Sequence, residues 1–97
     1  MIIVQDTVVA KPGNASKLAK LLKEVMANNK ELIHIMTDMT GQFNRVIMLS
    51  KFENLAAYEK SWDKLKENTE EMKKMQEKMK DYTEMYLTGS REIFQVW

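Results

Sequence analysis

Four stretches of this chain have the β-branched and apolar composition of strands, and each looks apolar on nearly both faces. They cover residues 1–10, 31–40, 42–52 and 83–97, and apolar residues at helical spacing fill the gaps after the first and third. With right-handed crossovers, the order strand, helix, strand, turn, strand, helix, strand gives a ferredoxin-like βαββαβ fold. The sequence therefore predicts an α+β protein whose four-stranded antiparallel sheet carries helices on one face.

The apolar runs at residues 2–4, 32–33, 35–36, 46–49 and 93–94 break the alternation that a half-exposed sheet shows. Helices on so small a sheet cover one face, so the other face needs a cover of its own. Left open, it would expose a larger apolar patch than monomers usually tolerate. We therefore expect a homodimer through the sheet face. A third helical segment folded over the sheet is the competing explanation.

The two central strand segments read as a hairpin around Gly41, the residue there that adopts positive φ without cost. With a two-residue loop, even positions of residues 32–38 share a face with odd positions of residues 43–49, and a three-residue loop reverses this. The last strand segment is interrupted at Gly89 and Ser90, where a bulge or bend is expected.

The second helical segment follows Asn54, a capping residue, and its apolar stripe includes Tyr58 and Trp62. These two rings are expected to anchor the helix on the sheet, with a pocket-lining role as the alternative. The stripe continues far beyond Trp62, so the segment is either one long helix or two helices with a break near Asn68. The capping pattern at Asn68 favours the break.

The composition is that of a folded single domain, which we assign to residues 1–97. Lysine plus arginine numbers 15 against 14 for aspartate plus glutamate, so there is no basic excess to attract nucleic acid. No window approaches the roughly 18 apolar residues of a membrane span, and the first apolar run is too short for a signal sequence. We therefore expect a cytoplasmic protein that binds neither nucleic acid nor membrane.

Several polar residues interrupt the apolar strands and are the candidates for chemistry. The catalytic candidates are Asp6, His34 and Arg45, and the polar residues that could accompany them are Gln5, Asn44, Tyr86 and Arg91. In a cleft between sheet and helices, a buried carboxylate or imidazole would have a shifted pKa suited to proton transfer. The alternative is structural: Asp38 pairs with Arg45 across the hairpin, and Asp6 pairs with an arginine on a neighbouring strand.

The sequence predicts no metal site and no cofactor. His34 is the single histidine and cysteine is absent, so a zinc or iron site would lack its usual ligands. His34 could serve alone as an axial haem ligand, but its neighbours in the strand are ordinary core residues. We therefore expect no haem binding.

The segment from residue 41 to residue 55 carries a family resemblance. It contains a glycine turn, an asparagine three residues later, an apolar strand, an aromatic residue and a helix start, at Gly41, Asn44, Val46, Leu49, Phe52 and Leu55. In this pattern the chain resembles the NIPSNAP-like families of the dimeric α/β-barrel superfamily. It departs from them at Met48 and Ser50, where members often carry histidine and tryptophan, and near Glu59, where arginine is common.

The resemblance implies a homodimer with a cleft between sheet and helices in each subunit. We predict that the cleft binds a small apolar or aromatic molecule. The candidate ligand-binding residues are Tyr58, Trp62, Tyr86 and Arg91. The superfamily also includes cofactor-independent and haem-degrading oxygenases, so a small monooxygenase that uses the catalytic candidates or Trp62 is the alternative, and an interaction module without a pocket is the third. Fold alone does not decide among them.

Overall fold

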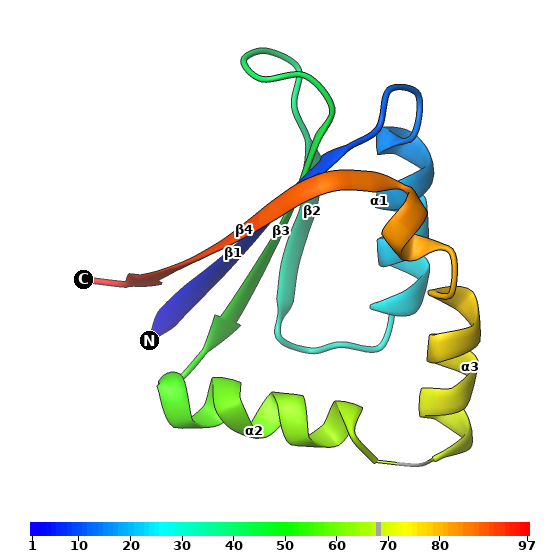
Figure 1. Cartoon of the computed structure of the whole chain (residues 1–97). Helices are drawn as coiled ribbons and strands as arrows, with labels where there is room; N and C mark the ends of the chain where they lie inside the picture. The colour runs from blue at the N-terminus through cyan, green and yellow to red at the C-terminus, as the bar shows by residue number, and fades with distance from the viewer. Residues whose placement is uncertain (68) are drawn as a thin grey trace.

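The computed structural model describes residues 1–67 and 69–97, apart from the side chain of Leu65, and confirms the βαββαβ order (Figure 1). The strands are β1 (Ile2–Ala10), β2 (Leu32–Thr37), β3 (Arg45–Phe52) and β4 (Tyr86–Gln95), the helices are α1 (Ala15–Val25), α2 (Leu55–Leu65) and α3 (Glu70–Lys78), and η1 (Tyr82–Glu84) is a short 3-10 turn. The sheet is antiparallel with the order β2-β3-β1-β4, and the helices lie on one side of it.

The strand register divides the side chains of the sheet between two faces. Asp6 lies between Met48 of β3 and Arg91 of β4, so these three side chains share a face. Even-numbered residues of β1 point toward the helices, where Ile2 and Val4 are buried. The odd-numbered residues of β1 and their partners form the opposite face, which we call the open face.

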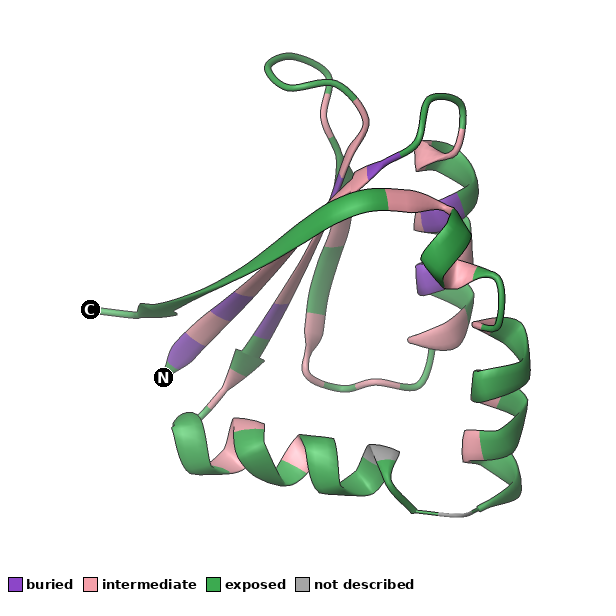
Figure 2. Cartoon of the chain, in the orientation of Figure 1, coloured by how far each residue is buried: buried purple, intermediate pink, exposed green. Residues whose placement is uncertain are grey.

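The core lies between the helix side of the sheet and α1. Leu18 of α1 is fully buried and Leu22 nearly so, and they pack with Ala10 and Val46 of the two central strands. Figure 2 shows that the buried residues gather in β1, β3 and α1. The apolar spacing of the first helical segment therefore identified its buried side. Asn14 occupies the position before α1, but its side chain makes no capping hydrogen bond.

The open face has no helix over it among the described residues (Figure 1). Its apolar side chains are Ile3, Val9, Met36, Ile47, Leu49 and Phe94. Met36 is 38% exposed and Phe94 is 46% exposed. On β4, Ser90 and Glu92 bring polar groups to the same face. The apolar second face predicted from the sequence is thus present but interrupted, because Gln5 and Thr7 of β1, His34 of β2 and Arg45 of β3 lie on it as well.

The β2–β3 hairpin keeps the facing relation that a two-residue loop would give, although its loop is longer. Met36 pairs with Ile47, so even positions of β2 share a face with odd positions of β3. The connection runs from the end of β2 at Thr37 to the start of β3, with Gly41 at φ 96° and Asn44 at φ 64°. An even number of inserted residues preserves the relation, because side chains alternate with a period of two.

The bulge in β4 lies at Leu87, and the expectation of a bulge at Gly89 and Ser90 is wrong. Val9 pairs with Thr88 while Ala10 pairs with Tyr86, which leaves Leu87 as the extra residue. Gly89 keeps an ordinary strand conformation. A Cβ there would lie 3.4 Å from the carbonyl oxygen of Thr7, so the missing side chain leaves space on the helix side of the sheet.

The long second helical segment is interrupted, as the sequence favoured. Helix α2 ends at Leu65 and α3 begins at Glu70, and Asn68, the predicted break point, lies outside the described residues. The side chain of Thr69 caps α3 by accepting a hydrogen bond from the amide of Met72 at 3.2 Å. Helix α3 packs against α1 and not over the open face, which excludes a third helical segment as its cover.

Candidate functional site

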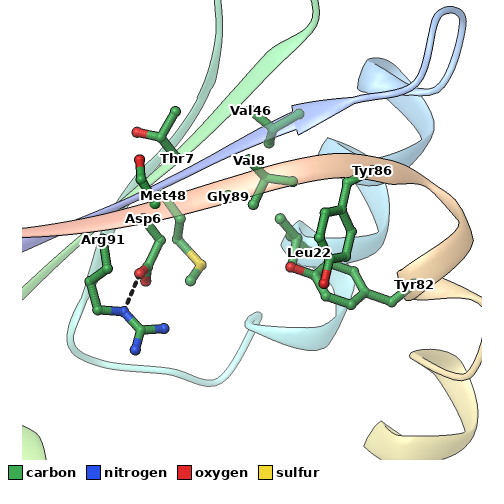
Figure 3. A pocket seen from close by; sticks show the side chains of 11 residues that line it. Asp6, Thr7, Val8, Leu22, Val46, Met48, Tyr82, Tyr86, Gly89 and Arg91 are labelled. Atoms are coloured by element: carbon green, nitrogen blue, oxygen red, sulfur yellow. Dashed lines mark hydrogen bonds and ion pairs between the residues drawn. The ribbon is translucent and has the colours of Figure 1, made fainter.

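A cavity of about 390 Å³ lies between the helix side of the sheet and the segment containing α1 and η1. Its walls include Asp6, Leu22, Met48, Tyr82, Tyr86 and Arg91 (Figure 3). Gly89 also borders it, and the absence of a side chain there widens the cavity. The polar groups of Asp6 and Arg91 lie at one end and the two tyrosines at the other, with apolar side chains between them. This volume lies within the range of small-molecule sites, and the lining combines apolar side chains with a few polar groups.

Asp6 and Arg91 form an ion pair across β1 and β4. Nε of Arg91 donates to Oδ1 of Asp6 at 2.5 Å, with 19% of the Asp6 side chain and 45% of the Arg91 side chain exposed. Burial by itself lowers the pKa of Arg91, but the hydrogen bond and charge of Asp6 outweigh it and raise the pKa. The prediction that Asp6 pairs with an arginine on a neighbouring strand is confirmed.

Tyr82 and Tyr86 pack against each other, with ring centroids 4.8 Å apart. Burial raises the pKa of Tyr82, and the nearby Tyr86 and Asp6 raise it further, against a smaller opposite effect of Arg91. The phenol of Tyr82 therefore stays neutral at physiological pH. It can donate a hydrogen bond into the cavity, but it does not act as a phenolate base.

Helix α2 brings two aromatic rings beside Arg91. The guanidinium carbon lies 4.9 Å from the ring centroid of Trp62 and 5.9 Å from that of Tyr58. Tyr58 also meets Phe52 of β3 edge to face at 5.1 Å. Both rings contact residues of the sheet, which confirms that they anchor α2 on it, although Trp62 is 40% exposed and its indole covers Arg91 instead of entering the core. Asn54 caps α2 as predicted, by accepting from the amide of Ala57.

His34 and Arg45 are not part of this cluster. His34 pairs with Leu49, which places its exposed side chain on the open face. Arg45 pairs with Val9 on the same face, and its Nε lies 3.3 Å from Oδ2 of Asp38. The structural interpretation of Arg45 is therefore confirmed. A single polar site built from the three catalytic candidates does not form, because Asp6 lies on the helix side of the sheet and the other two lie on the open face.

Among the cavity residues that were not sequence candidates are Met48, Tyr82 and Gly89. Met48 is predictable once the register is known, because it pairs with Asp6. Tyr82 lies in η1, four residues before Tyr86, and its position depends on how the chain turns after α3. The hydrophobic pattern of the sequence did not predict that turn.

Two further results concern the part of the chain that the structure describes. In residues 1–67 and 69–97, no three side chains of the types that ligate metals come together. Over the same residues, no helix is both long enough and apolar enough to cross a membrane.

Solved structures with the same fold cover nearly the whole chain. A NIPSNAP family protein from Agrobacterium tumefaciens has a TM-score of 0.81 at 17% identity, covering 97% of this chain and 90% of its own. An uncharacterized NIPSNAP domain protein from Burkholderia xenovorans has a TM-score of 0.80 at 10% identity, with coverages of 100% and 95%. An antibiotic biosynthesis monooxygenase has a TM-score of 0.63 at 11% identity, with coverages of 100% and 99%. At these identities the likeness establishes the fold alone.

Sequence comparison gives a more specific result. No protein with a curated description matches the chain significantly. The NIPSNAP family model matches residues 9–88, which include β2, β3 and all three helices. The resemblance seen at residues 41–55 thus extends over most of the sequence. The chain belongs to the NIPSNAP family.

Proposed function

We propose that this NIPSNAP-family chain binds a small apolar or aromatic molecule in the cavity between its sheet and helices. The observation that carries the proposal is the lining of that cavity, where apolar side chains and two tyrosines adjoin a single ion pair. Small-molecule sites combine these features, since apolar surface supplies affinity and a few polar groups set orientation.

Binding is favoured over catalysis by the state of the titratable groups. Asp6 is engaged by Arg91, which makes it a poor general base, and the phenol of Tyr82 is neutral. His34 lies on the other side of the sheet. The monooxygenase alternative needs a group in the cavity that moves a proton, and neither the paired Asp6 nor the neutral Tyr82 is suited to this role.

The same proposal includes a homodimer in which two open faces pack together. Its support is the exposure of apolar side chains on a face with no helix over it among the described residues. A twofold axis would place the apolar β2–β3 half of each face against its partner. The cavity lies on the opposite side of the sheet, so each subunit would keep its own site.

Nuclear magnetic resonance with 2-naphthol as a neutral aromatic probe tests the binding site directly. The chain has three glycines, so their amide signals serve as local reporters. Gly89 borders the cavity, whereas Gly13 and Gly41 lie in loops away from it. A saturable shift of the Gly89 signal, with the other two unchanged, is expected. Absence of a Gly89 shift at saturating probe would contradict the proposal.

A pair of variants on one strand provides the control. Gly89→Leu adds a side chain that fills the cavity and is expected to raise the probe Kd by about tenfold or more. Thr88→Leu adds the same side chain to the opposite face of β4 and should leave the Kd unchanged. Equal binding by both variants would place the probe elsewhere.

A further inference from the structure

Arg91 has N–H donors that no described residue accepts. Its Nε donates to Asp6, and its two Nη atoms carry the remaining N–H groups of the guanidinium. Within residues 1–67 and 69–97, neither Nη atom has an acceptor at hydrogen-bond distance. Figure 3 shows both Nη atoms turned away from the strand that bears them. Arg91 thus presents a planar pair of donors at one end of the cavity.

The plane of the guanidinium is set by contacts on two sides. Asp6 holds Nε, and the rings of Trp62 and Tyr58 lie 4.9 Å and 5.9 Å from the guanidinium carbon. Cation–π attraction to these rings limits rotation of the side chain. An oriented guanidinium matches the two oxygens of a carboxylate, because parallel N–H···O bonds form without further ordering.

Tyr58 supplies a second, independent observation. Its hydroxyl oxygen is buried and has no hydrogen-bond partner among the described residues. Buried hydroxyls without partners are uncommon in folded proteins. Tyr58 contacts Arg91 but is not among the residues that line the cavity, so its hydroxyl is an unsatisfied polar group beside the guanidinium and not itself a ligand contact.

We propose that the ligand is an aromatic or apolar monocarboxylate whose two oxygens accept hydrogen bonds from the Nη atoms of Arg91. Its body enters the cavity toward Tyr82 and Tyr86. This inference rests on the function proposed above. The charge of Asp6 does not prevent it: Asp6 bonds at Nε, so a carboxylate at the Nη edge lies nearer to the guanidinium than to Asp6. Coulomb attraction therefore exceeds the repulsion.

A matched pair of probes tests this inference on the unmodified protein. The two are 2-naphthoate and 2-naphthamide, which share their ring system and differ in the charge of one small group. At a pH of about 7 the acid is ionised. Calorimetry is expected to show that naphthoate binds about tenfold more tightly or better, with both probes shifting the Gly89 signal.

Two arginine variants locate the origin of the preference. Arg91→Gln should remove it, so that the acid and the amide bind alike, while Arg91→Lys should retain part of it through the remaining charge. Arg45→Gln changes the other arginine, on the open face, and should leave the preference intact. Near-native spectra of Arg91→Lys would show that the fold survives changes at this position.

The outcomes separate the two proposals. Equal affinities of the unmodified protein for acid and amide, with Gly89 shifted by both, overturn the carboxylate inference and leave the binding cavity standing. Failure of both probes to shift Gly89 overturns the proposed function and this inference with it. A preference that survives in Arg91→Gln and is lost in Arg45→Gln would place the carboxylate site on the open face.

Discussion

Each face of the sheet carries one arginine, and the two arginines have different surroundings. On the helix side, Arg91 lies at the edge of a cavity, paired with Asp6 and covered by Trp62. On the open face, Arg45 lies at the start of β3 and forms an ion pair with Asp38. Asp38 follows Met36 by two residues in the sequence. The helices therefore enclose the surroundings of Arg91, whereas no described part of the chain covers the surroundings of Arg45.

This difference shows that pairing with a carboxylate does not by itself distinguish a structural arginine from one that binds a ligand. Both arginines have an acidic partner, at 2.5 Å and 3.3 Å. Arg45 additionally donates from Nη2 to the carbonyl oxygen of Thr40, which ties it into the hairpin. The distinguishing feature of Arg91 is the cavity beside its unused donors.

The largest expected effect comes from breaking the open face. Ile47→Arg places a charge at the centre of the proposed interface, and twofold symmetry places it there twice. Burying an unpaired charge costs several kcal/mol, so the dimer Kd should rise by about a thousandfold or more. Light scattering at micromolar concentration should change from about twice 11.4 kDa to 11.4 kDa.

Gln76→Arg is the control for that experiment, because it adds the same charge to an exposed position of α3. The control should remain dimeric. A monomeric parent protein, or an Ile47→Arg variant of unchanged mass, would show that the open face is not a dimer interface.

The next effect concerns the core on the helix side. Leu18→Ala removes a fully buried side chain and should lower the free energy of unfolding by about 2–5 kcal/mol. Leu87→Ala, at a side chain that is 64% exposed, should cost less than about 1 kcal/mol. Urea denaturation in the Ile47→Arg background keeps dimer dissociation out of the comparison. Equal costs at both positions would contradict the location of the core.

The element order was predictable from the sequence because each segment has a clear periodicity. Leu18 and Leu22 fall at helical spacing, and the apolar runs of β1 and β3 mark the strands. The ends of the elements and the irregularities within strands were harder to predict from the sequence. The bulge lies at Leu87, whereas Gly89 fits an ordinary strand. No residue pattern separates a glycine that bends a strand from a glycine that leaves space.

The site was predictable only in part. Asp6 and Arg91 stood out as charges in apolar strands, but so did His34 and Arg45. Which of these share a face depends on strand register, and a shift of one residue reverses every side chain of a strand. The sequence fixes that register through contacts distant along the chain, so the grouping needed the three-dimensional structure.

The smallest expected effect is a pH dependence that arises in the cavity. Folding raises the pKa of Tyr82, chiefly through burial, so the folded chain holds this proton more tightly than the unfolded chain. The resulting stability is fully present below the unfolded pKa of about 10 and is lost as pH rises through the folded value. Tyr82→Phe should therefore lose less stability above that pH than the parent in urea titrations. Leu87→Ala, which changes no titrating group, should keep the parent slope, and the same slope in Tyr82→Phe would mean that the phenol is solvated.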